Sequence, residues 1–373
     1  MNILLAPDKF KGSLTANEVC DALKQGLLQT NPELNIISIP LADGGEGTCE
    51  LLTQYFKGSI ISVEVVGPRF EKINAAYGIS NDGNTAFIEM AKASGLQLLK
   101  PENRNPLLTT TFGTGELIRH ALDRGVKKIL LGIGGSATTD AGMGMAHAVG
   151  FEFYDSNDKL LKPIGENLVR LHSIKTDKVH PNIKDTNFVA LCDVDNPLFG
   201  AKGAAYTYAP QKGANEKAVK LLDDGLRNFE KIIQQTFKTT ANFPGAGAGG
   251  GLPGGAKVFL NMTIHRGMEY IIKATGLEEK IQQADLIITG EGKIDQQTLA
   301  GKVVMEIGKL GLKYNKQVVA ITGKCELRNL ELQKIGLAHV ISLMDYQVSE
   351  KEAIAKASSL IQEKAKNFIT LSC

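Results

Sequence analysis

Short apolar runs that end in glycine-rich polar segments, and then lead into helices, limit this chain to few folds. The clearest example is the apolar run 127–131, which predicts a buried strand. It is followed by the glycine-rich segment 132–144 and by a helical pattern over 141–149. At such a junction glycines let backbone N–H groups approach an anion, and the first helical turn adds unpaired donors. The same glycines can instead form only a tight turn, but the arrangement recurs along the chain.

Both ends of the chain repeat this order of strand, polar loop and helix. A strand over 2–6 leads into a loop with Asp8 and Lys11, and then into a helix opened by the capping box from Thr15 to Glu18. Further strands of this kind are expected over residues 36–41, 285–289, 317–321 and 339–343. Such alternation of strands and helices is typical of a parallel α/β sheet.

The middle of the chain has a different pattern. Short alternating strands are expected over 60–66, 73–79 and 85–90, and their spacing favours antiparallel pairing. A strand over 189–193 and a long helix over 215–236 follow.

These patterns predict an α/β fold with two domains. A doubly wound, mostly parallel sheet domain is built from both chain ends, residues 1–60 and 284–373, and a second α/β domain, residues 61–283, is inserted. The active site is expected in the cleft between them, because loops at the carboxyl ends of parallel strands line one crevice. The polar residues expected at this edge are Asp8, Lys11, Asp43, Glu46, Glu291, Lys293, Asp295 and Lys324.

The charge and cysteine content exclude several classes of protein. The 373 residues contain 42 Lys and Arg against 40 Asp and Glu, which argues against nucleic acid or an anionic membrane surface as the main partner. Five cysteines without a C-x-x-C motif predict reduced thiols in a cytoplasmic protein. Neither an export signal nor an apolar stretch of membrane-spanning length is found. The oligomeric state is left open, a homo-oligomer included.

Glycine-rich loops, lysines and several carboxylates together favour phosphoryl transfer. Backbone amides and lysines hold phosphates, carboxylates bind Mg²⁺, and one carboxylate accepts the proton of the acceptor hydroxyl. The P-loop motif and the protein-kinase motifs are absent. G-x-G-x-x-G occurs twice within 243–255, but no apolar strand precedes it, so we expect a flexible or ligand-covering loop there. The six histidines show no metal-ligand spacing.

Along nearly its whole length the chain resembles the type I glycerate kinases. The matching motifs are APD and FKGSLT (6–8, 10–15), ADGGEGT (42–48), EMA and ASGL (89–91, 93–96), GTGE (113–116), GGSAT (134–138), CDV and NPL (192–194, 196–198), PQKGA (210–214) and TGEG (289–292), with Asp295, Gln297, Thr298, Gly301 and Lys302. The resemblance implies phosphorylation of D-glycerate, a small-molecule substrate, with ATP and Mg²⁺ as cofactors. The chain departs from the family pattern at Lys9, Phe112 and Thr139, where Ser, Tyr and Asn are usual.

We assign the candidate catalytic roles to Asp193, Lys11 and Asp295. Asp193 follows a strand and is either the base that takes the hydroxyl proton or a Mg²⁺ ligand, unless it only caps the next turn. Lys11 neutralises the transferred phosphoryl group or the glycerate carboxylate, unless it is a solvated loop lysine. Asp295 lies near Glu291 and Lys293, and these three alternatively form an ion pair that only orders the loop.

The remaining candidates bind substrate, phosphate or metal. Asp43 and Glu46 are the predicted Mg²⁺ ligands, although Glu46 alternatively caps the next helix. Ser136 and Thr138 are expected to hold phosphate or carboxylate through the start of the helix after them. The full set of predicted substrate-binding and phosphate-binding residues is Asp8, Ser13, Gly134, Gly135, Ser136, Thr138, Gly290, Glu291 and Lys293.

Two other functions stay open alongside the kinase. A non-catalytic sensor of sugar acids would need the anion-binding loops but not the carboxylates. A dinucleotide-dependent oxidoreductase would need G-x-G-x-x-G directly after a strand, which is absent. The sequence does not decide between the 2-hydroxyl and the 3-hydroxyl of glycerate, and 2-phosphoglycerate is the favoured product. It also leaves open which carboxylate is the base and which binds Mg²⁺.

Overall fold

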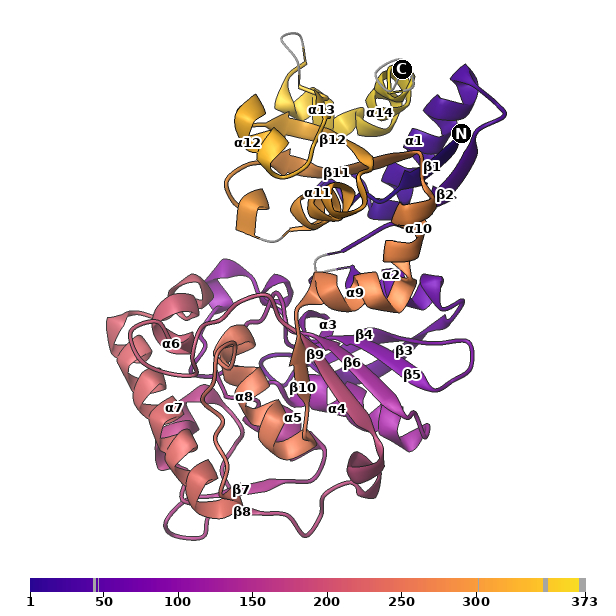
Figure 1. Ribbon diagram of the computed structural model, residues 1–373. Coiled ribbons are helices and arrows are strands. Elements are labelled where there is room, and N and C mark those ends of the chain that lie inside the picture. The colour runs from indigo at the N-terminus through magenta and orange to yellow at the C-terminus, as the bar shows by residue number, and fades with distance from the viewer. Residues whose placement is uncertain (43–44, 46, 301, 345–347, 369–373) are drawn as a thin grey trace. The chain divides into compact units, whose positions relative to one another are not determined.

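The computed structural model describes residues 1–42, 45, 47–300, 302–344 and 348–368. It has two compact units (Figure 1). The first, here called the terminal unit, comprises Met1–Asp43 and Gly267–Cys373, and the second, the middle unit, comprises Gly44–Arg266. The units therefore divide at 43/44 and 266/267, whereas the sequence suggested 60/61 and 283/284. Both units contain a sheet covered by helices, so the predicted α/β fold class is confirmed.

The sheet of the terminal unit is parallel throughout and joins the two ends of the chain. Its strands, in the order β13-β12-β11-β1-β2, are β13 (His339–Ser342), β12 (Gln317–Cys325), β11 (Leu286–Ile294), β1 (Asn2–Leu5) and β2 (Asn35–Ser38). Side chains that alternate along a strand, such as Ile3 and Leu4, are both buried. Burial on both faces is what a sheet covered by helices on each side requires.

The helices of the terminal unit cover this sheet. They are α1 (Ala16–Thr30), α9 (Gly267–Thr275), α10 (Leu277–Gln283), α11 (Val303–Tyr314), α12 (Asn329–Lys334), α13 (Glu350–Ala355) and α14 (Ala357–Ala365). The predicted capping box is present, because Thr15 and Glu18 exchange hydrogen bonds at the start of α1. Helix α1 packs on α14, and α11 packs on β11 and β12.

The sheet of the middle unit is mixed. Its strands, in the order β10-β9-β6-β5-β4-β3, are β10 (Thr263–His265), β9 (Asn187–Leu191), β6 (Lys128–Gly132), β5 (Thr85–Glu89), β4 (Lys72–Ile79) and β3 (Ser59–Val66). The predicted antiparallel pairing is confirmed for β3 with β4 and for β4 with β5, whereas β5, β6, β9 and β10 run parallel. A separate antiparallel pair joins β7 (Glu152–Tyr154) to β8 (Ser173–Lys175).

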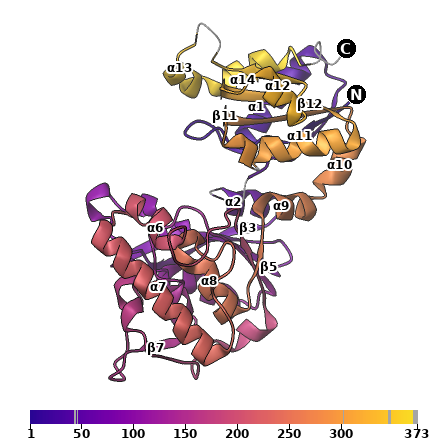
Figure 2. The ribbon, with the colours of Figure 1, turned by 60° about the vertical axis from the view of Figure 1, so that its left-hand side comes forward.

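The helices of the middle unit include one long amphipathic helix. They are α2 (Thr48–Tyr55), α3 (Ala91–Ser94), α4 (Phe112–Asp123), α5 (Met143–Ala148), α6 (Ala204–Tyr208), α7 (Glu216–Phe237) and α8 (Ala248–Leu260). Helix α7 is capped by Asn215, whose side chain accepts a hydrogen bond from the N–H of Ala218. Helices α7 and α8 lie side by side in both ribbon views (Figure 1, Figure 2).

The glycine-rich segment 243–255 is packed inside the middle unit, which corrects the expected flexible or ligand-covering loop. Gly249, Gly250 and Gly251 have positive φ angles of 56°, 76° and 93°. A Cβ atom on Gly250 would lie 1.9 Å from the carbonyl oxygen of Thr138. Glycine is therefore required here by a close approach of two backbones, and the segment supports the loop that contains Thr138.

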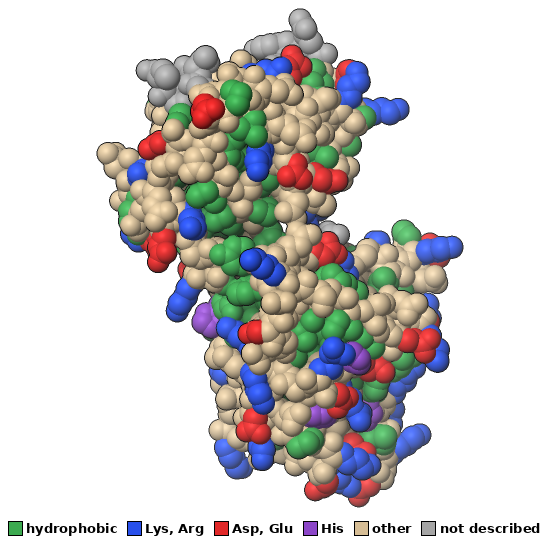
Figure 3. All heavy atoms as spheres, turned by 90° about the vertical axis from the view of Figure 1, so that its right-hand side faces the viewer, with side chains coloured by type: hydrophobic (Ala, Val, Ile, Leu, Met, Phe, Trp, Pro, Cys, Tyr) green, Lys and Arg blue, Asp and Glu red, His purple; other side chains and the backbone are tan. Residues whose placement is uncertain are grey.

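The structure also bears on the expectations about the cysteines, membrane-spanning helices and surface charge. Of the cysteines, Cys20, Cys49, Cys192 and Cys325 are free thiols, and the first three are buried, while Cys373 lies outside the described residues. Within the described ranges, none of the helices has the length and apolar character needed to cross a membrane. Acidic and basic side chains lie interspersed on the face shown in Figure 3, which agrees with the small net charge of +2.

Candidate active site

Three parallel strands of the middle unit end side by side at one edge of the sheet. Glu89, Gly132 and Leu191 close β5, β6 and β9, and they are partners in the strand register. The segments that leave these ends contain the 134–138 loop and Asp193. The predicted anion-binding loop and the predicted catalytic carboxylate therefore belong to the same sheet edge, as expected for loops at the carboxyl ends of parallel strands.

The 134–138 loop presents glycine backbone to solvent. Gly134 and Gly135 are exposed, and Gly135 has a φ angle of 75°. The loop is fixed by hydrogen bonds from the N–H of Leu96 to the carbonyl of Gly135 and from the N–H of Ala137 to the carbonyl of Ser94. Within the described part of the chain, the N–H groups of Gly134 and Gly135 donate no hydrogen bond. They are free to donate to an anion.

The helix after this loop does not start where the sequence suggested, and its start is already occupied. Helix α5 begins at Met143, five residues beyond Thr138, so neither Ser136 nor Thr138 lies at its N-terminus. The buried carboxylate of Asp140 accepts hydrogen bonds from the N–H groups of Gly142 (3.3 Å) and Gly144 (3.2 Å). The expectation that an anion binds at the start of this helix is therefore wrong, because the carboxylate of Asp140 already accepts hydrogen bonds from the N–H groups there.

Asp140 also ties the loop to α4. Its carboxylate accepts from the N–H and the hydroxyl of Thr111, at 2.7 Å and 2.8 Å, directly before α4. Burial raises the pKa of Asp140 above its usual value, and these hydrogen bonds oppose that shift. Asp140 is therefore a structural carboxylate that joins two elements beneath the loop.

A buried lysine lies behind the 134–138 loop. The Nζ atom of Lys212 donates to the hydroxyl of Ser136 at 2.7 Å and to the carbonyl of Thr138 at 2.6 Å. Lys212 is only 2% exposed, and burial lowers its pKa to about 7. The hydroxyls of Thr138 and Thr139 are buried and make no hydrogen bond with a described residue. Ser136, Thr138 and Thr139 directly follow the exposed glycines in the chain, so these buried polar groups belong to the same loop region.

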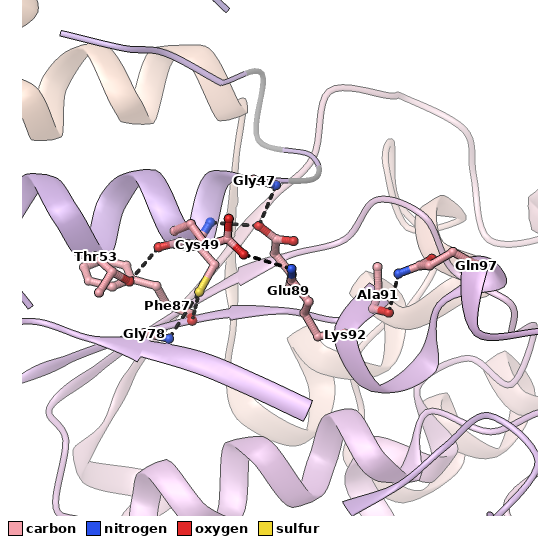
Figure 4. A network of polar contacts seen from close by, with 10 residues as sticks. Gly47, Cys49, Thr53, Gly78, Phe87, Glu89, Ala91, Lys92 and Gln97 are labelled. Carbon is pink, nitrogen blue, oxygen red and sulfur yellow. Dashed lines mark hydrogen bonds and ion pairs between the residues drawn. The ribbon is translucent and has the colours of Figure 1, made fainter. Parts of the chain in front are cut away.

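Glu89 forms a second buried polar centre at this edge (Figure 4). One of its carboxylate oxygens accepts from the N–H of Gly47 at 2.9 Å and from the N–H of Cys49 at 2.8 Å. The other oxygen is buried and has no hydrogen-bond partner among the described residues. Burial raises the pKa of Glu89, while these hydrogen bonds and Lys92 lower it. Glu89 thereby fixes the start of α2 through Gly47 and Cys49.

The two carboxylates after β9 have different surroundings. Asp195 forms an ion pair with Arg266, whose Nη2 atom lies 3.0 Å and 3.4 Å from its two oxygens. Arg266 also donates to the backbone carbonyl of Asp193 at 3.5 Å, while the Asp193 side chain is exposed. The adjacent pocket, lined by Cys192, Val194, Phe243 and other residues, has a volume of about 520 Å³. Arg266 thus contacts both the carboxylate of Asp195 and the backbone of Asp193.

In the terminal unit, the loop after β1 lies against β11. The N–H of Asp8 donates to the carbonyl of Gly290 at 2.8 Å, and a Cβ on Gly292 would lie 3.2 Å from the N atom of Lys11. Asp8 is buried and accepts from the N–H of Lys9, whereas Lys11 is exposed. The structure therefore brings together the predicted residues of these two segments.

Gly290, Glu291 and Lys293 belong to β11 itself, which corrects the expectation that they form a loop after it. Strand β11 continues to Ile294 because its polar half pairs with the polar half of β12, where Lys293 is the partner of Lys324. Glu291 is buried, accepts a hydrogen bond from the hydroxyl of Thr298 at 2.5 Å, and lies 3.9 Å from Lys302. Buried Glu291 therefore stabilises the turn that follows β11.

Lys293 and Asp295 take part in an ion-pair network, which is the expected alternative to a catalytic role for them. Lys293 lies 3.3 Å from Asp295 and 2.9 Å from Glu326, and Lys324 lies 2.8 Å from Glu326. A hydrogen bond from the N–H of Gln297, followed by Lys293, holds the pKa of Asp295 below its usual value. Asp295 is thus ionised and engaged within its own unit.

The other candidates divide between structural roles and residues outside the described ranges. The hydroxyl of Ser13 donates to the carbonyl of Ile354 at 2.7 Å, so it joins the first loop to α13. Asp43 and Glu46, the predicted Mg²⁺ ligands, lie outside the described residues.

Comparison with known proteins decides the family. Residues 3–372 match the glycerate kinase family. The chain belongs to the glycerate kinase family. A glycerate kinase of Halalkalibacterium halodurans is 42% identical over 371 residues, which cover 99% of this chain and 98% of that protein. A glycerate 2-kinase of Escherichia coli is 43% identical over 324 residues, covering 87% of this chain and 85% of that protein.

A solved structure agrees with this family. A putative glycerate kinase 2 from Salmonella typhimurium LT2 has a TM-score of 0.90 and 40% identity, and the match covers 99% of this chain and 97% of that one. The chain is accordingly a kinase that phosphorylates glycerate, and the suspected resemblance is confirmed.

The structure describes the surroundings of Phe112 and Thr139, two residues at which this glycerate kinase departs from the family pattern. The ring of Phe112 packs near those of Phe70 and His147, at centroid distances of 6.4 Å and 5.7 Å, which agrees with a packing role. Thr139 is fully buried and its hydroxyl is unpartnered within the described chain.

Glu89 and Lys212 are two buried charged residues of this kinase that are absent from the predicted site residues. Both stand in motifs that carried the resemblance, EMA and PQKGA, and each is the one charged residue of its motif. That context was the available signal. Their partners lie 40 to 76 residues away, so no local pattern pointed to them.

Among the buried carboxylates of the described residues, Glu89 has an oxygen without a hydrogen-bond partner, which a metal ion could use. No group of three or more His, Cys, Asp or Glu side chains suited to a metal occurs in the described part of the chain. Mg²⁺ commonly uses only one or two carboxylates together with phosphate oxygens and water. The unpartnered oxygen of Glu89 shows that this edge holds a carboxylate in excess of its internal donors.

Proposed function

We propose that this glycerate kinase transfers the γ-phosphoryl group of ATP to the 2-hydroxyl of D-glycerate, with Mg²⁺, and forms 2-phosphoglycerate. The observation that carries the proposal is the exposed Gly134–Gly135 backbone, supported from behind by Lys212, at the sheet edge from which Asp193 also extends. The relative named glycerate 2-kinase supports the choice of hydroxyl.

In this proposal the 134–138 loop holds an anionic group, either the glycerate carboxylate or a phosphoryl group. Its unpaired N–H groups donate to that anion. Asp193 accepts the proton of the 2-hydroxyl as that oxygen bonds to phosphorus and the bond to the ADP oxygen breaks. Asp193 is preferred over Asp195 because Asp193 belongs to the CDV motif that carries the family resemblance, whereas Asp195 lies outside that motif.

Mg²⁺ supplies charge neutralisation for the phosphate groups in this scheme. Asp43 and Glu46 stay the proposed ligands, and Glu89 fixes the chain just after them by accepting from Gly47 and Cys49. In the terminal unit, Lys11 is the proposed partner of the transferred phosphoryl group.

The remaining assignments in the terminal unit rest on the contact between the loop after β1 and strand β11. Asp8, Gly290, Glu291 and Lys293 are proposed to shape the surface that faces substrate or phosphate, and Asp295 is kept as a catalytic candidate. The ion pair with Lys293 favours an ordering role for Asp295, which makes it the weaker choice beside Asp193.

The product identifies the reaction and the hydroxyl at once. Protein with Mg²⁺, ATP and D-glycerate is expected to form a monoester whose ³¹P resonance is split into a doublet by the single proton on carbon 2. A triplet from two protons would mean 3-phosphoglycerate and would refute the choice of hydroxyl. Binding of glycerate without any product would favour the sensor, and tight binding of NAD(H) would favour the oxidoreductase.

Gly135→Ala is expected to raise the KM for one anionic substrate about tenfold, because an L-residue is strained at its φ of 75° and its Cβ would lie 3.1 Å from that of Ala91. Gly125→Ala is the matched control, since its φ is 77° and a Cβ there meets nothing within 4 Å. Steady-state kinetics with each substrate varied separates glycerate from ATP. Equal KM values for the two variants would contradict the assignment of the 134–138 loop to the anion-binding site.

A further inference from the structure

Lys212 is a costly residue for the position it occupies. It closes the short 3-10 helix Pro210–Lys212 and is only 2% exposed. Moving an ammonium group out of water is unfavourable unless acceptors replace the water. The acceptors that the structure provides are the hydroxyl of Ser136 and the carbonyl of Thr138, both in the 134–138 loop. The buried ammonium group therefore donates its hydrogen bonds to this loop.

The hydrogen bond from Lys212 also determines what Ser136 can do. A hydroxyl that accepts from an ammonium directs its own proton to another acceptor. The hydroxyl of Thr138 is buried and unpartnered among the described residues, so a second donor is available beside it. With the N–H groups of Gly134 and Gly135, the loop carries several donors and a positive charge behind them. Such a set fits an anion.

We propose that Lys212 is a positioning residue that holds the 134–138 loop in its anion-binding form and supplies the positive charge to which the bound carboxylate or phosphoryl group responds. The inference rests on the proposed function, because it takes the loop as the anion site of the kinase. Lys212 acts through Ser136 and the backbone at Thr138, with no contact to the reacting atoms.

The charge of Lys212 links anion binding to proton uptake. Burial lowers the pKa of Lys212 to about 7, and the charged group acting on it among the described residues is Asp140, which raises that pKa. Above pH 7 the lysine is mainly neutral in the free enzyme. An anion in the loop favours the ammonium form, so binding takes up a proton, and affinity falls as the pH rises above 7.

Calorimetry of ligand binding at pH 8 in buffers of different ionisation enthalpy measures this uptake directly. D-glycerate and a non-hydrolysable ATP analogue with Mg²⁺ are the two ligands, titrated separately. Their own groups stay deprotonated at this pH, since a carboxyl has a pKa of about 3.5 and a phosphate second pKa is about 6. One ligand is expected to bind with uptake of up to one proton, which identifies the anion that the loop holds. No uptake with either ligand in the wild-type protein would overturn the proposal.

Substitutions then assign the proton to Lys212. Lys212→Met is expected to abolish the uptake and to raise the KM of the same ligand about tenfold, while Lys212→Arg keeps the charge at all pH values and retains affinity above pH 7. Lys178→Met is the control, because Lys178 is an exposed lysine of the same unit paired with Glu152. Unchanged uptake in Lys212→Met would contradict the inference.

Failure of this inference and failure of the proposed function give different results. If Gly135→Ala raises KM but the wild-type protein takes up no proton, the loop binds the anion and only the role of Lys212 is wrong. If glycerate is not phosphorylated, the proposed function is wrong, and the calorimetry still tests Lys212. Should Lys212→Met fail to fold, the wild-type measurement alone supports or refutes the linkage.

Discussion

Asp193→Asn is expected to lower kcat by about 10²–10⁴, the usual contribution of a general base. The amide keeps the shape of the carboxylate but cannot accept the hydroxyl proton. Asp193 is exposed at the end of β9, so the variant should unfold at the same temperature as the wild-type protein. Steady-state kinetics at saturating substrate, with Mg²⁺ varied, measures the effect.

The dependence on Mg²⁺ distinguishes the two roles proposed for Asp193. If it is the base, kcat falls at every Mg²⁺ concentration, whereas loss of a metal ligand raises the concentration needed for half-maximal activity. Asp195→Asn is the matched control two residues away, because Arg266 already engages that carboxylate. A kcat for Asp193→Asn within about threefold of wild type would exclude it as the base.

Asp140→Ala is expected to reduce the free energy of unfolding by about 3–4 kcal/mol. Asp140 is fully buried, and its removal leaves buried donors without acceptors at Thr111 and Gly144, which its carboxylate now receives at 2.7 Å and 3.2 Å. The start of α5 and the start of α4 would both lose their shared partner. Urea denaturation with a check for two-state behaviour gives the value.

Asp140→Asn is the conservative control for this effect. Its amide oxygen can still accept hydrogen bonds, so we expect a loss of about 1–2 kcal/mol. If Asp140→Ala loses less than about 1 kcal/mol, the loop and α5 do not depend on this carboxylate.

Comparison of particular elements shows what local sequence could predict. The strands β1 and β6 and the apolar first half of β12, residues 317–321, were recognisable because a strand buried on both faces is a continuous apolar run. The polar second half of β11 was assigned to a loop, because the strand pairing that orders Glu291 and Lys293 comes from β12, about thirty residues later. Local polarity cannot report a distant pairing partner.

The prediction of a flexible or ligand-covering loop over 243–255 was wrong for a related reason. Glycine runs usually indicate flexible chain, but here the missing Cβ atoms allow Gly250 to pack against the backbone of Thr138. The helix start at Met143 was also misplaced, because Asp140 accepts hydrogen bonds from residues after it and from Thr111, 29 residues before it.

The sequence by itself determined the α/β class, the order of most strands and helices, the sheet edges that carry polar residues, and membership of the glycerate kinase family. Those properties are written in local apolar patterns and in motifs. Only the tertiary structure decided that Lys212 supports Ser136, 76 residues away, and that Glu89 holds the start of α2, 40 residues away. Such contacts depend on which strands become neighbours in the sheet, and that is decided by burial of the whole chain.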